Sequence, residues 1–542
     1  MFARLRRLLP ARFAISGLML SSLIVMGGYL LSRVSGLLRE VVISAQFGTS
    51  AELGAYRAAF KVTDLLYMVI IGGALGSSFI PIFIQVWERD GQARAWRLAS
   101  AVTTWALGIL AVASALLWLT APQLTAWFYG GQGFTLDTLE LTTNLTRMFL
   151  LSPLLLGLGG LAMAALNAHE RFTLPALAPA LYNIGIIAGA VLLAPTLGIW
   201  GLAWGVIGGA AVYLLIQIPG LIALGMRLRP TLGRGMGEVR EVGVQMGPRV
   251  LGQAASQLSI LVTAALTARL VLGAERLAGL DYAYQMMLLP YGIFSLSLAT
   301  VAFPRLARLY SAGNRSEFDQ SIRTTFGTIL LLTLPATVVL LTLHVPLVRV
   351  LFQRGAFDNT SLSYTTVALI GYATALPAFA ASEILIRSFY AMQRTWTPVL
   401  VGVGQVLLNL SLGILALQLG GGVGALALAF SIANNIEAIL LFGLLGRSLP
   451  GIWREPQLWR TVRAAFAASL ILAGLLWGAV QVSVGWLPSL SAAGAYQWQQ
   501  DVVGVIGWLI LVGSVGTVVY IGLSALFGAA PAQRVLHRIR GG

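Results

Sequence analysis

Long apolar runs constrain this chain more than any other feature of its sequence. Fourteen runs are bounded by charged or turn-forming residues, and each can form a membrane helix, which needs about 20 apolar residues. They lie near residues 13–37, 60–87, 96–120, 141–166, 173–195, 198–226, 243–272, 280–305, 321–345, 361–390, 396–418, 421–447, 458–482 and 502–527. Only 10% of the 542 residues are charged, against about 25% in a soluble domain. The pattern predicts an all-α integral membrane protein with fourteen transmembrane helices.

The arginines fall mainly on one side of the membrane that these helices would cross. They gather at 4–12, 89–97, 227–240, 305–323, 447–463 and 534–540, whereas the loops at 121–140 and 483–501 contain none. Because cytoplasmic loops carry the excess of basic residues, both termini are predicted to be cytoplasmic, with basic ends at 1–12 and 528–542. The formal charge of +16 comes from residues that separate the apolar runs. We therefore expect membrane lipid, and no nucleic acid, as a partner.

Four prolines recur at a nearly constant offset along the chain. The pairs are Pro81 and Pro304, Pro122 and Pro346, Pro153 and Pro377, and Pro175 and Pro398, each 223 or 224 residues apart. The spacing indicates an N-lobe at 13–226 and a C-lobe at 227–447, each of six helices, followed by two more helices at 448–527. Since six is even, the copies share one orientation. We expect a pseudo-two-fold axis along the membrane normal and a substrate site between the lobes.

Several kinds of chemistry find no residues to carry them. The chain has no cysteine, which removes disulfides, thiol catalysis and thiolate metal sites. Its one lysine, Lys61, is followed by Val62, so the phosphate-binding loop of an ATPase cannot form. The histidines, His169, His344 and His537, show no ligand spacing, so we expect no metal site and no cofactor. We see no nucleophile–base set and no catalytic carboxylate pair, and we expect no enzyme activity.

Charged residues inside the apolar runs are the candidate substrate contacts, since a charge at membrane depth is expensive and normally faces a cavity or a partner. Arg33 and Glu40 would share one helix face, about 10 Å apart along the axis. Arg33 either lines a cavity or pairs with Glu40. Arg39 and Glu40 would lie near the external end, as a gate or an interfacial anchor. Lys61 and Asp64 either form an intrahelical pair or contact a head group.

Polar residues on later runs are further candidates for the cavity wall. Glu383 and Arg387 stand in the order that favours an intrahelical ion pair, and are either such a pair or a substrate contact. Glu437 follows two asparagines, and it either lines the cavity, carries a coupling proton or belongs to polar packing between helices. The candidate cavity set is Asp64, Gln285, Glu383, Arg387, Asn409 and Glu437.

Short motifs resemble the MurJ (MviN) family, in order from about residue 15 to about 530. The stretch Ser32-Arg33-Val34-Ser35-Gly36-Leu37-Leu38-Arg39-Glu40, then Phe47-Gly48, is similar to the family's S-R-x-x-G-x-x-R-[DE] and F-G opening. Ala59-Phe60-Lys61 with Leu65-Leu66 resembles its A-F-K-x-P-N-L-L. Two later matches are Gln245-Met246-Gly247-Pro248 with Ser256-Gln257, and Phe389-Tyr390-Ala391 with Thr397-Pro398. No single motif is specific, but the ordered set is.

The resemblance implies a lipid II flippase of the bacterial inner membrane, in the multidrug/oligosaccharidyl-lipid/polysaccharide exporter superfamily. It implies a central cationic cavity that accepts the diphosphate and sugar head, with Arg33, Arg39, Glu40 and Lys61 as substrate contacts. Arginine offers planar, permanently charged donors that suit phosphate oxygens, and the polyprenyl tail can stay in lipid. We expect a monomer that works by alternating access, driven by membrane potential rather than ATP.

The sequence departs from the family pattern at several charged positions. The family's arginine pair on the second run is replaced by Tyr67-Met68, and a nearby acid by Gly72. On the eighth run the family's Y-A-D-R reads Tyr282-Ala283-Tyr284-Gln285. We therefore expect an acid and a cavity arginine to be missing there.

The acids of the sodium site reported for some members are also replaced. Thr263 stands on the seventh run, and Gly413 follows Asn409 by four residues. These losses leave two alternatives to lipid II transport. One is export of another lipid-linked glycan or an amphiphile, and the other is a transport-inactive scaffold for envelope assembly.

Overall fold

The computed structural model describes residues 17–70 and 74–541 of the chain. All regular structure in these ranges is helical, apart from one isolated β-bridge between Gly131 and Phe134. The all-α prediction is confirmed. The predicted basic segment at 1–12 and the replaced position Gly72 lie outside the described residues.

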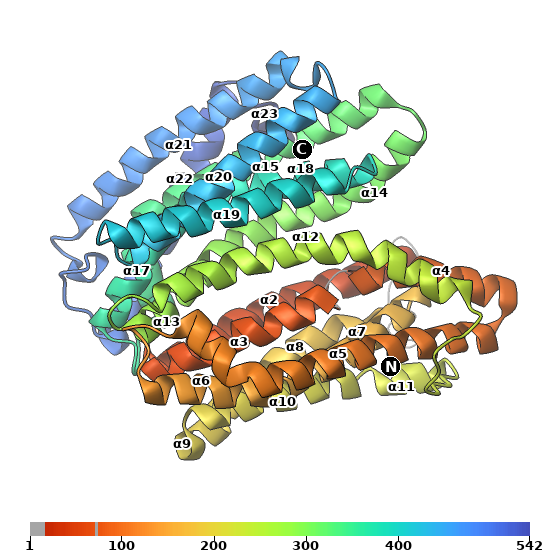
Figure 1. The fold of residues 1–542 in the computed structure, drawn as a ribbon. Helices are drawn as coiled ribbons and strands as arrows, with labels where there is room; N and C mark the ends of the chain where they lie inside the picture. Colours follow the sequence, from red (N-terminus) through yellow and green to blue (C-terminus); the bar gives the residue numbers. More distant parts are fainter. Residues whose placement is uncertain (1–16, 71–73, 542) are drawn as a thin grey trace, which may run out of the picture. The chain divides into compact units, whose positions relative to one another are not determined.

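Short connections join the helices along the chain (Figure 1). The first half contains α2 (Gly17–Phe47), α3 (Ala51–Ile70), α4 (Ala74–Asp90), α5 (Gln92–Tyr129), α6 (Leu136–Phe149), α7 (Leu151–Ala168), α8 (Thr173–Ala188), the π-helical turn η2 (Gly189–Leu193), α9 (Ala194–Leu197), α10 (Ile199–Leu215) and α11 (Ile218–Ala223). The next part contains α12 (Gly237–Thr267), α13 (Gly273–Pro290), the π-helical turn η3 (Tyr291–Leu296), α14 (Ser297–Ser311), α15 (Arg315–Thr342), α16 (His344–Phe352), α17 (Asn359–Ala373), α18 (Leu376–Ala391), α19 (Trp396–Gln418) and α20 (Val423–Ser448). The last part contains η4 (Ile452–Arg454), α21 (Pro456–Ser483), η5 (Pro488–Leu490), α22 (Trp498–Leu526) and α23 (Ala530–Gly541).

Every one of the fourteen predicted runs falls on helix within the described residues. Ten of the described helices are long and apolar enough to cross a membrane, and an eleventh span results if α17 and α18, bent by 48° at their junction, are taken together. The helix α3 is interrupted by four charged residues within its length of 20, so composition alone does not mark it as a span. The multi-pass membrane fold is confirmed, and the count of fourteen stays a prediction.

The repeated prolines occupy matching places in their helices in most cases. Pro81 is the eighth residue of α4, and Pro304 is the eighth residue of α14. The pair Pro122 and Pro346 differs, because α5 continues through Pro122 whereas the second copy breaks at Leu343, just before α16. The copies therefore share local structure without being identical.

The turns that precede α8 and α19 give independent support for the repeat. Pro175 and Pro398 are the third residues of these helices. Glu170 and Gln393, one before each helix, have φ angles of 57° and 59°. Positive φ is uncommon in residues other than glycine, so its recurrence at the repeat offset argues for two copies of one unit. The superposition of whole lobes stays a prediction.

Packing divides the chain into two compact units. The first consists of Met1–Ile43, Thr63–Ala121 and Asn144–Val250, and the second of Ser44–Val62, Pro122–Thr143 and Leu251–Gly542. The second unit therefore contains the ends of α2, α3, α5 and α6 that adjoin the predicted external loops, together with most of the second copy. The lobes at 13–226 and 227–447 follow the sequence repeat, and their boundaries stay a prediction.

Each unit has its own apolar core. In the first, Phe83 and Trp96 pack with Leu166 from α7. In the second, Phe389 and Leu441 belong to a core around α15, α18 and α20, and Trp508 to another between α21 and α22. Burial of these rings and side chains holds helices together that are distant in sequence.

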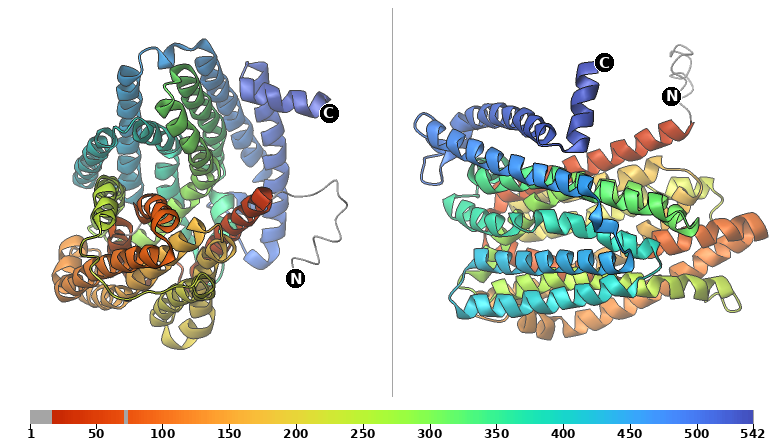
Figure 2. Two further views of the ribbon diagram at one scale, coloured as in Figure 1. Left: turned by 90° about the vertical axis from the view of Figure 1, so that its right-hand side faces the viewer. Right: turned by 90° about the horizontal axis from the view of Figure 1, so that it is seen from above.

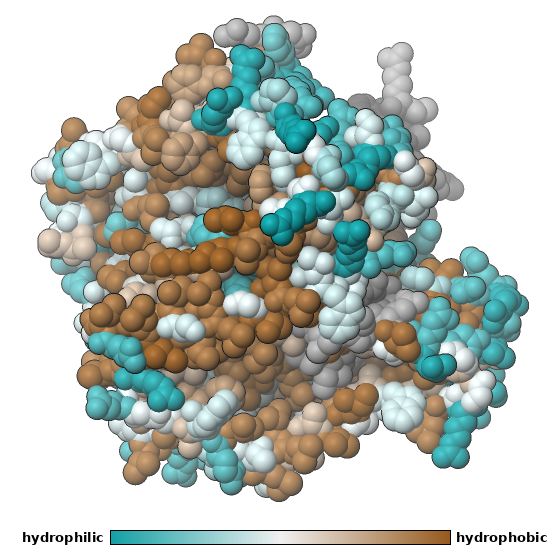
Figure 3. Space-filling model, turned by 45° about the horizontal axis from the view of Figure 1, so that its top comes forward, coloured by the Kyte–Doolittle hydropathy of each residue, from teal (hydrophilic) through white to brown (hydrophobic). Residues whose placement is uncertain are grey.

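The outward faces of the helices carry many large apolar side chains (Figure 3). On α22, Val503, Val518 and Leu526 are 76%, 72% and 76% exposed. Such a surface suits lipid rather than water. After α22 the chain turns at Gly528, whose φ is 94°, and α23 leaves at a steep angle, as the violet end of the chain shows in Figure 2.

Candidate functional site

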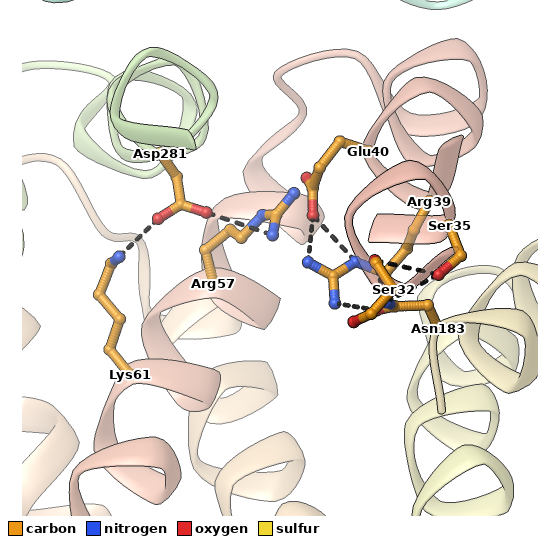
Figure 4. Close-up of polar contacts among 8 residues, drawn as sticks. All are labelled: Ser32, Ser35, Arg39, Glu40, Arg57, Lys61, Asn183 and Asp281. Carbon is orange, nitrogen blue, oxygen red and sulfur yellow. Dashed lines mark hydrogen bonds and ion pairs between the residues drawn. The ribbon is translucent and has the colours of Figure 1, made fainter. Parts of the chain in front are cut away.

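Three charged side chains form an ion cluster between α3 and α13 (Figure 4). The carboxylate of Asp281 on α13 lies 2.5 Å from Lys61 Nζ and 3.2 Å from Arg57 Nη1, both on α3. The side chains of Asp281, Arg57 and Lys61 are 7%, 8% and 15% exposed. Because Arg57 and Lys61 are four residues apart, they share one face of α3, and one carboxylate meets both. Each charge thus has a partner at a depth where an isolated charge would be costly.

A glycine allows α3 and α13 to approach closely beside this cluster. A Cβ atom at Gly54 would overlap the backbone of Ala274, so a side chain there would force the two helices apart. The guanidinium of Arg57 also lies over the ring of Tyr282, 5.4 Å from its centre. The helices α3 and α13 are equivalent in the two predicted copies, so the cluster joins the first copy to the second.

The structure corrects two expectations about these residues. Lys61 takes Asp281 as its partner, where the sequence pattern predicted Asp64. The eighth run was expected to lack its acid, but Asp281 supplies one three residues before Tyr284. Arg57 and Asp281 were not predicted, because both fall outside the family motifs. The available signal was a charge inside an apolar run, with Arg57 one helical turn before Lys61.

The cluster lies at similar depths on its two helices. Lys61 stands ten residues after Ala51, the start of α3, and Asp281 eight residues after Gly273, the start of α13. At 1.5 Å per residue these positions are about 15 and 12 Å from the helix starts. Both starts are at the predicted external side, so we expect the cluster in the outer half of the membrane.

Loops from the two copies interlock in the second compact unit. Gly48 has a φ of 53° and leaves no room for a Cβ atom against Ala356, and Gly355, with a φ of 57°, does the same against Ala45. The amide of Ala356 donates a hydrogen bond to Ala45 O at 2.8 Å. Backbone packed this closely holds the ends of α2 and α16 together.

A second polar cluster joins α2 to α8 in the first compact unit (Figure 4). Arg39 donates from Nε and Nη2 to Glu40 Oε1 at 3.0 and 2.7 Å, and from Nη1 to Asn183 Oδ1 at 3.0 Å. The amide of Asn183 donates to Ser32 O and Ser35 Oγ, each at 3.2 Å. Glu40 is buried. Asn183 was not predicted, because a single asparagine in an apolar run forms no recognisable pattern.

Arg33 differs from its neighbours on α2. Its side chain is exposed, and none of the ion pairs among the described residues includes it. The proposed pairing of Arg33 with Glu40 is not what the structure contains, since Glu40 accepts from Arg39. Leu30 and Val34, on the same helix, are exposed as well. The guanidinium of Arg33 is therefore accessible to a ligand.

The positions where the family pattern has lost charge are half-buried. These are Tyr67, Met68, Tyr284 and Gln285, and Asp64 is half-buried too. The ring of Tyr284 packs against those of Tyr372 and Phe430, with centroid distances of 5.4 and 6.0 Å. An aromatic contact between α13, α17 and α20 thus occupies a place where the family has an acid.

The predicted pair Glu383 and Arg387 on α18 is confirmed as an ion pair. Arg387 Nη2 lies 2.7 Å from Glu383 Oε1, and both side chains are about one-fifth exposed. Tyr291 donates to Glu383 at 2.7 Å, and Arg387 donates to Thr300 Oγ1 at 3.0 Å. This network ties α18 to η3 and α14, so the pair has a structural role whether or not it also contacts substrate.

Asn409 is buried between α19 and α12. Its amide lies within hydrogen-bond distance of Ser259 Oγ and Thr263 Oγ1, at 3.0 and 2.9 Å, and Gln405 donates to Ser259 Oγ at 3.0 Å. Glu437 on α20 is half-buried, and no hydrogen bond among the described residues includes its carboxylate. Across 17–70 and 74–541, no three histidine, aspartate or glutamate side chains gather in a metal-binding arrangement.

Comparison with known proteins identifies the family. The sequence profile described as "Lipid II flippase MurJ" matches residues 43–496. The chain belongs to the MurJ family. It is 31% identical over 475 residues to the protein named lipid II flippase MurJ in Burkholderia cenocepacia, covering 84% of this chain and 89% of that one. It is 30% identical over 487 residues to a probable lipid II flippase MurJ of Rhizobium meliloti, covering 86% and 87%.

Solved structures agree on the fold. A structure titled "Lipid II flippase MurJ, inward closed conformation" matches 93% of this chain and 98% of that one, with a TM-score of 0.74 and 24% identity. An inward-facing multidrug transporter of the MATE family matches 78% of this chain and 96% of that one, with a TM-score of 0.65 and 14% identity. The fold is therefore that of MurJ and of the wider MOP superfamily, as the short motifs indicated.

Proposed function

We propose that this MurJ-family protein moves lipid II from the cytoplasmic to the outer leaflet of the bacterial inner membrane. The observation that carries the proposal is the set of cationic side chains on α2 and α3, inside otherwise apolar helices. A diphosphate head cannot cross hydrocarbon unaided, and such cations offer it charge-assisted hydrogen bonds. The family to which the chain belongs supports the same substrate.

Each cation has a separate part in the proposal. Arg33 makes the first contact with the diphosphate, because it is exposed and has no protein partner among the described ion pairs. Arg39, held by Glu40 and Asn183, presents its remaining surface to the head group. Lys61 then exchanges Asp281 for a phosphate oxygen, which keeps its charge compensated throughout.

The ion cluster of Arg57, Lys61 and Asp281 serves as an external gate in this proposal. It joins equivalent helices of the two copies, and the interlocked loops at Gly48 and Gly355 lie on the same predicted side. Binding of a diphosphate to Lys61 removes one of the two attractions on Asp281 and weakens the joint. Alternating access then needs only that the two copies separate externally and meet on the cytoplasmic side.

The remaining features of the proposal follow from topology and composition. We place both termini in the cytoplasm, since the basic loops lie on their side. The protein acts as a monomer, because each chain contains both copies of the repeat. Membrane potential drives the cycle, since the single lysine cannot form an ATPase phosphate loop.

A second substrate is favoured by one specific observation. Tyr284 and Gln285 replace an acid and an arginine of the family pattern, and Tyr284 is engaged with aromatic rings. A cavity with fewer charges and more rings would suit another polyprenyl-linked glycan. Rescue of cells depleted of their own lipid II flippase separates the two substrates.

In that experiment, native protein should restore growth and cell shape, whereas Arg33→Ala should not, although it reaches the membrane in equal amount. Arg538→Gln, a change of an exposed arginine on the C-terminal helix, is the matched control and should rescue fully. Failure of the native chain to rescue, at normal membrane abundance, would contradict lipid II as substrate and leave another glycan or the scaffold function.

A further inference from the structure

Two cavities meet in the second compact unit, away from the ion cluster. The first, of about 700 Å³, lies between α15, the start of α21, and α23, and is lined by Arg323, Glu455, Arg534 and His537 among other polar residues. The second, of about 620 Å³, is lined almost wholly by apolar side chains of α13, α15, α21 and α22. Thr328 and Pro531 belong to both linings. A polar compartment therefore opens directly onto an apolar one.

The charges of the polar compartment are mainly positive. Arg323 lies 4.0 Å from Glu455, the one acid in its lining, and donates to Ile452 O at 3.4 Å. Arg534 and His537 are exposed on α23 and are absent from the ion pairs among the described residues. Arginine presents donors that match phosphate oxygens. An anionic group would complement this compartment.

The apolar compartment extends far into the predicted hydrocarbon layer. Along α15 its lining runs from Thr328 to Leu343, which is about 22 Å at 1.5 Å per residue. That is more than half of a hydrocarbon core of about 30 Å. A small anion such as free phosphate would leave this space empty, so a ligand that fills both compartments carries a long apolar chain.

We propose that the joined cavities bind one anionic phospholipid from the cytoplasmic leaflet. Its phosphate lies against Arg323, Arg534 and His537, and an acyl chain lies in the apolar compartment between α15 and α22. The cytoplasmic leaflet is where anionic lipids attract basic side chains, and the basic residues of α23 stand on that predicted side. The site is separate from the candidate substrate contacts on α2 and α3, and does not depend on the proposed function.

Purified full-length protein in detergent tests this by native mass spectrometry. The probes are dioleoyl-phosphatidylglycerol and dioleoyl-phosphatidylcholine, which share acyl chains and differ in charge. The native protein should retain one phosphatidylglycerol in preference. Arg534→Gln combined with His537→Gln should weaken that binding about fivefold or more, at roughly 1 kcal/mol per basic contact. Arg538→Gln, on the same helix but outside the lining, should bind as the native protein does.

A second variant tests the apolar compartment. Gly513 lines it, and a Cβ atom there would meet no atom within 4 Å, so Gly513→Phe should fill the space without disturbing α22 and should remove binding. Gly507→Phe places the same ring on the same helix outside the lining and should leave binding unchanged.

Three results would overturn the proposal. One is equal retention of the two phospholipids by the native protein. Another is displacement of phosphatidylglycerol by millimolar inorganic phosphate, which would mean a simple anion site. The third is preferential retention of undecaprenyl phosphate over phosphatidylglycerol, lost in Gly513→Phe, which would assign the apolar compartment to a polyprenyl tail.

Discussion

Lys61 and Asp281 are 220 residues apart and are joined by an ion pair of 2.5 Å between α3 and α13. Each stands in an otherwise apolar stretch of helix, and Arg57 gives the same carboxylate a second cation at 3.2 Å. The pair connects equivalent helices of the predicted repeat. Its energetic character can therefore be tested directly by changing one member at a time.

Asp281→Asn should destabilise the protein more than Lys61→Met. The first change leaves two buried cations without their carboxylate, whereas the second leaves Asp281 paired with Arg57. Breaking a buried pair typically costs about 3–5 kcal/mol. Thermal unfolding in detergent measures the difference. Replacing Arg57, Lys61 and Asp281 together by Met, Met and Leu should recover most of the loss. An Asp281→Asn variant as stable as the native protein would mean that the cluster does not stabilise the fold.

Gly54→Ala should lower stability, although alanine normally favours a helix over glycine by about 1 kcal/mol. The added Cβ atom would overlap the backbone of Ala274 and push α13 away from α3. Gly108→Ala on α5 is the control, because a Cβ atom there meets nothing within 4 Å, and it should be neutral or stabilising. The unfolding temperatures of the two variants should therefore shift differently. A stabilised Gly54→Ala would show that the helices are not in contact there.

Arg33→Ala should abolish transport while the protein still folds and inserts. Its guanidinium makes no ion pair among the described residues, so its loss removes a ligand contact and little else. Arg33→Lys should restore transport poorly, because an ammonium lacks the forked donors. Arg39→Ala should differ by reducing folded yield, since Glu40 and Asn183 both depend on that side chain. Membrane abundance measured beside transport separates the two effects; equal transport in Arg33→Ala would remove Arg33 from the substrate path.

The predicted topology can be tested without removing any native thiol, because the chain has no cysteine. Single cysteines in place of Ala312 and Gln533, both exposed, should react only with reagents added from the cytoplasmic side. A cysteine in place of Ala493, between α21 and α22, should react from outside. Labelling of Ala312→Cys from the outside would reverse the assigned orientation.

The helices and the repeat could be read from the sequence because both leave periodic traces. Apolar runs mark lipid-facing helices, and prolines such as Pro81 and Pro304 mark the same place in two copies. The partners inside the charged clusters could not be read in this way. Asp281 meets Lys61 only because Gly54 lets α3 and α13 touch, and Asn183 meets Arg39 only because α8 packs beside α2. Such contacts depend on tertiary packing, and a local motif contains no information about it.

Reconstitution tests the central claim most directly. Purified protein is placed in liposomes with fluorescent lipid II, and a membrane-impermeant quencher reports how much of the lipid moves between leaflets when a membrane potential is applied. We predict movement well above that in protein-free liposomes, and movement at the protein-free level with Arg33→Ala. Lipid II that stays in its leaflet with folded native protein, or that moves equally with Arg33→Ala, would contradict the proposed function.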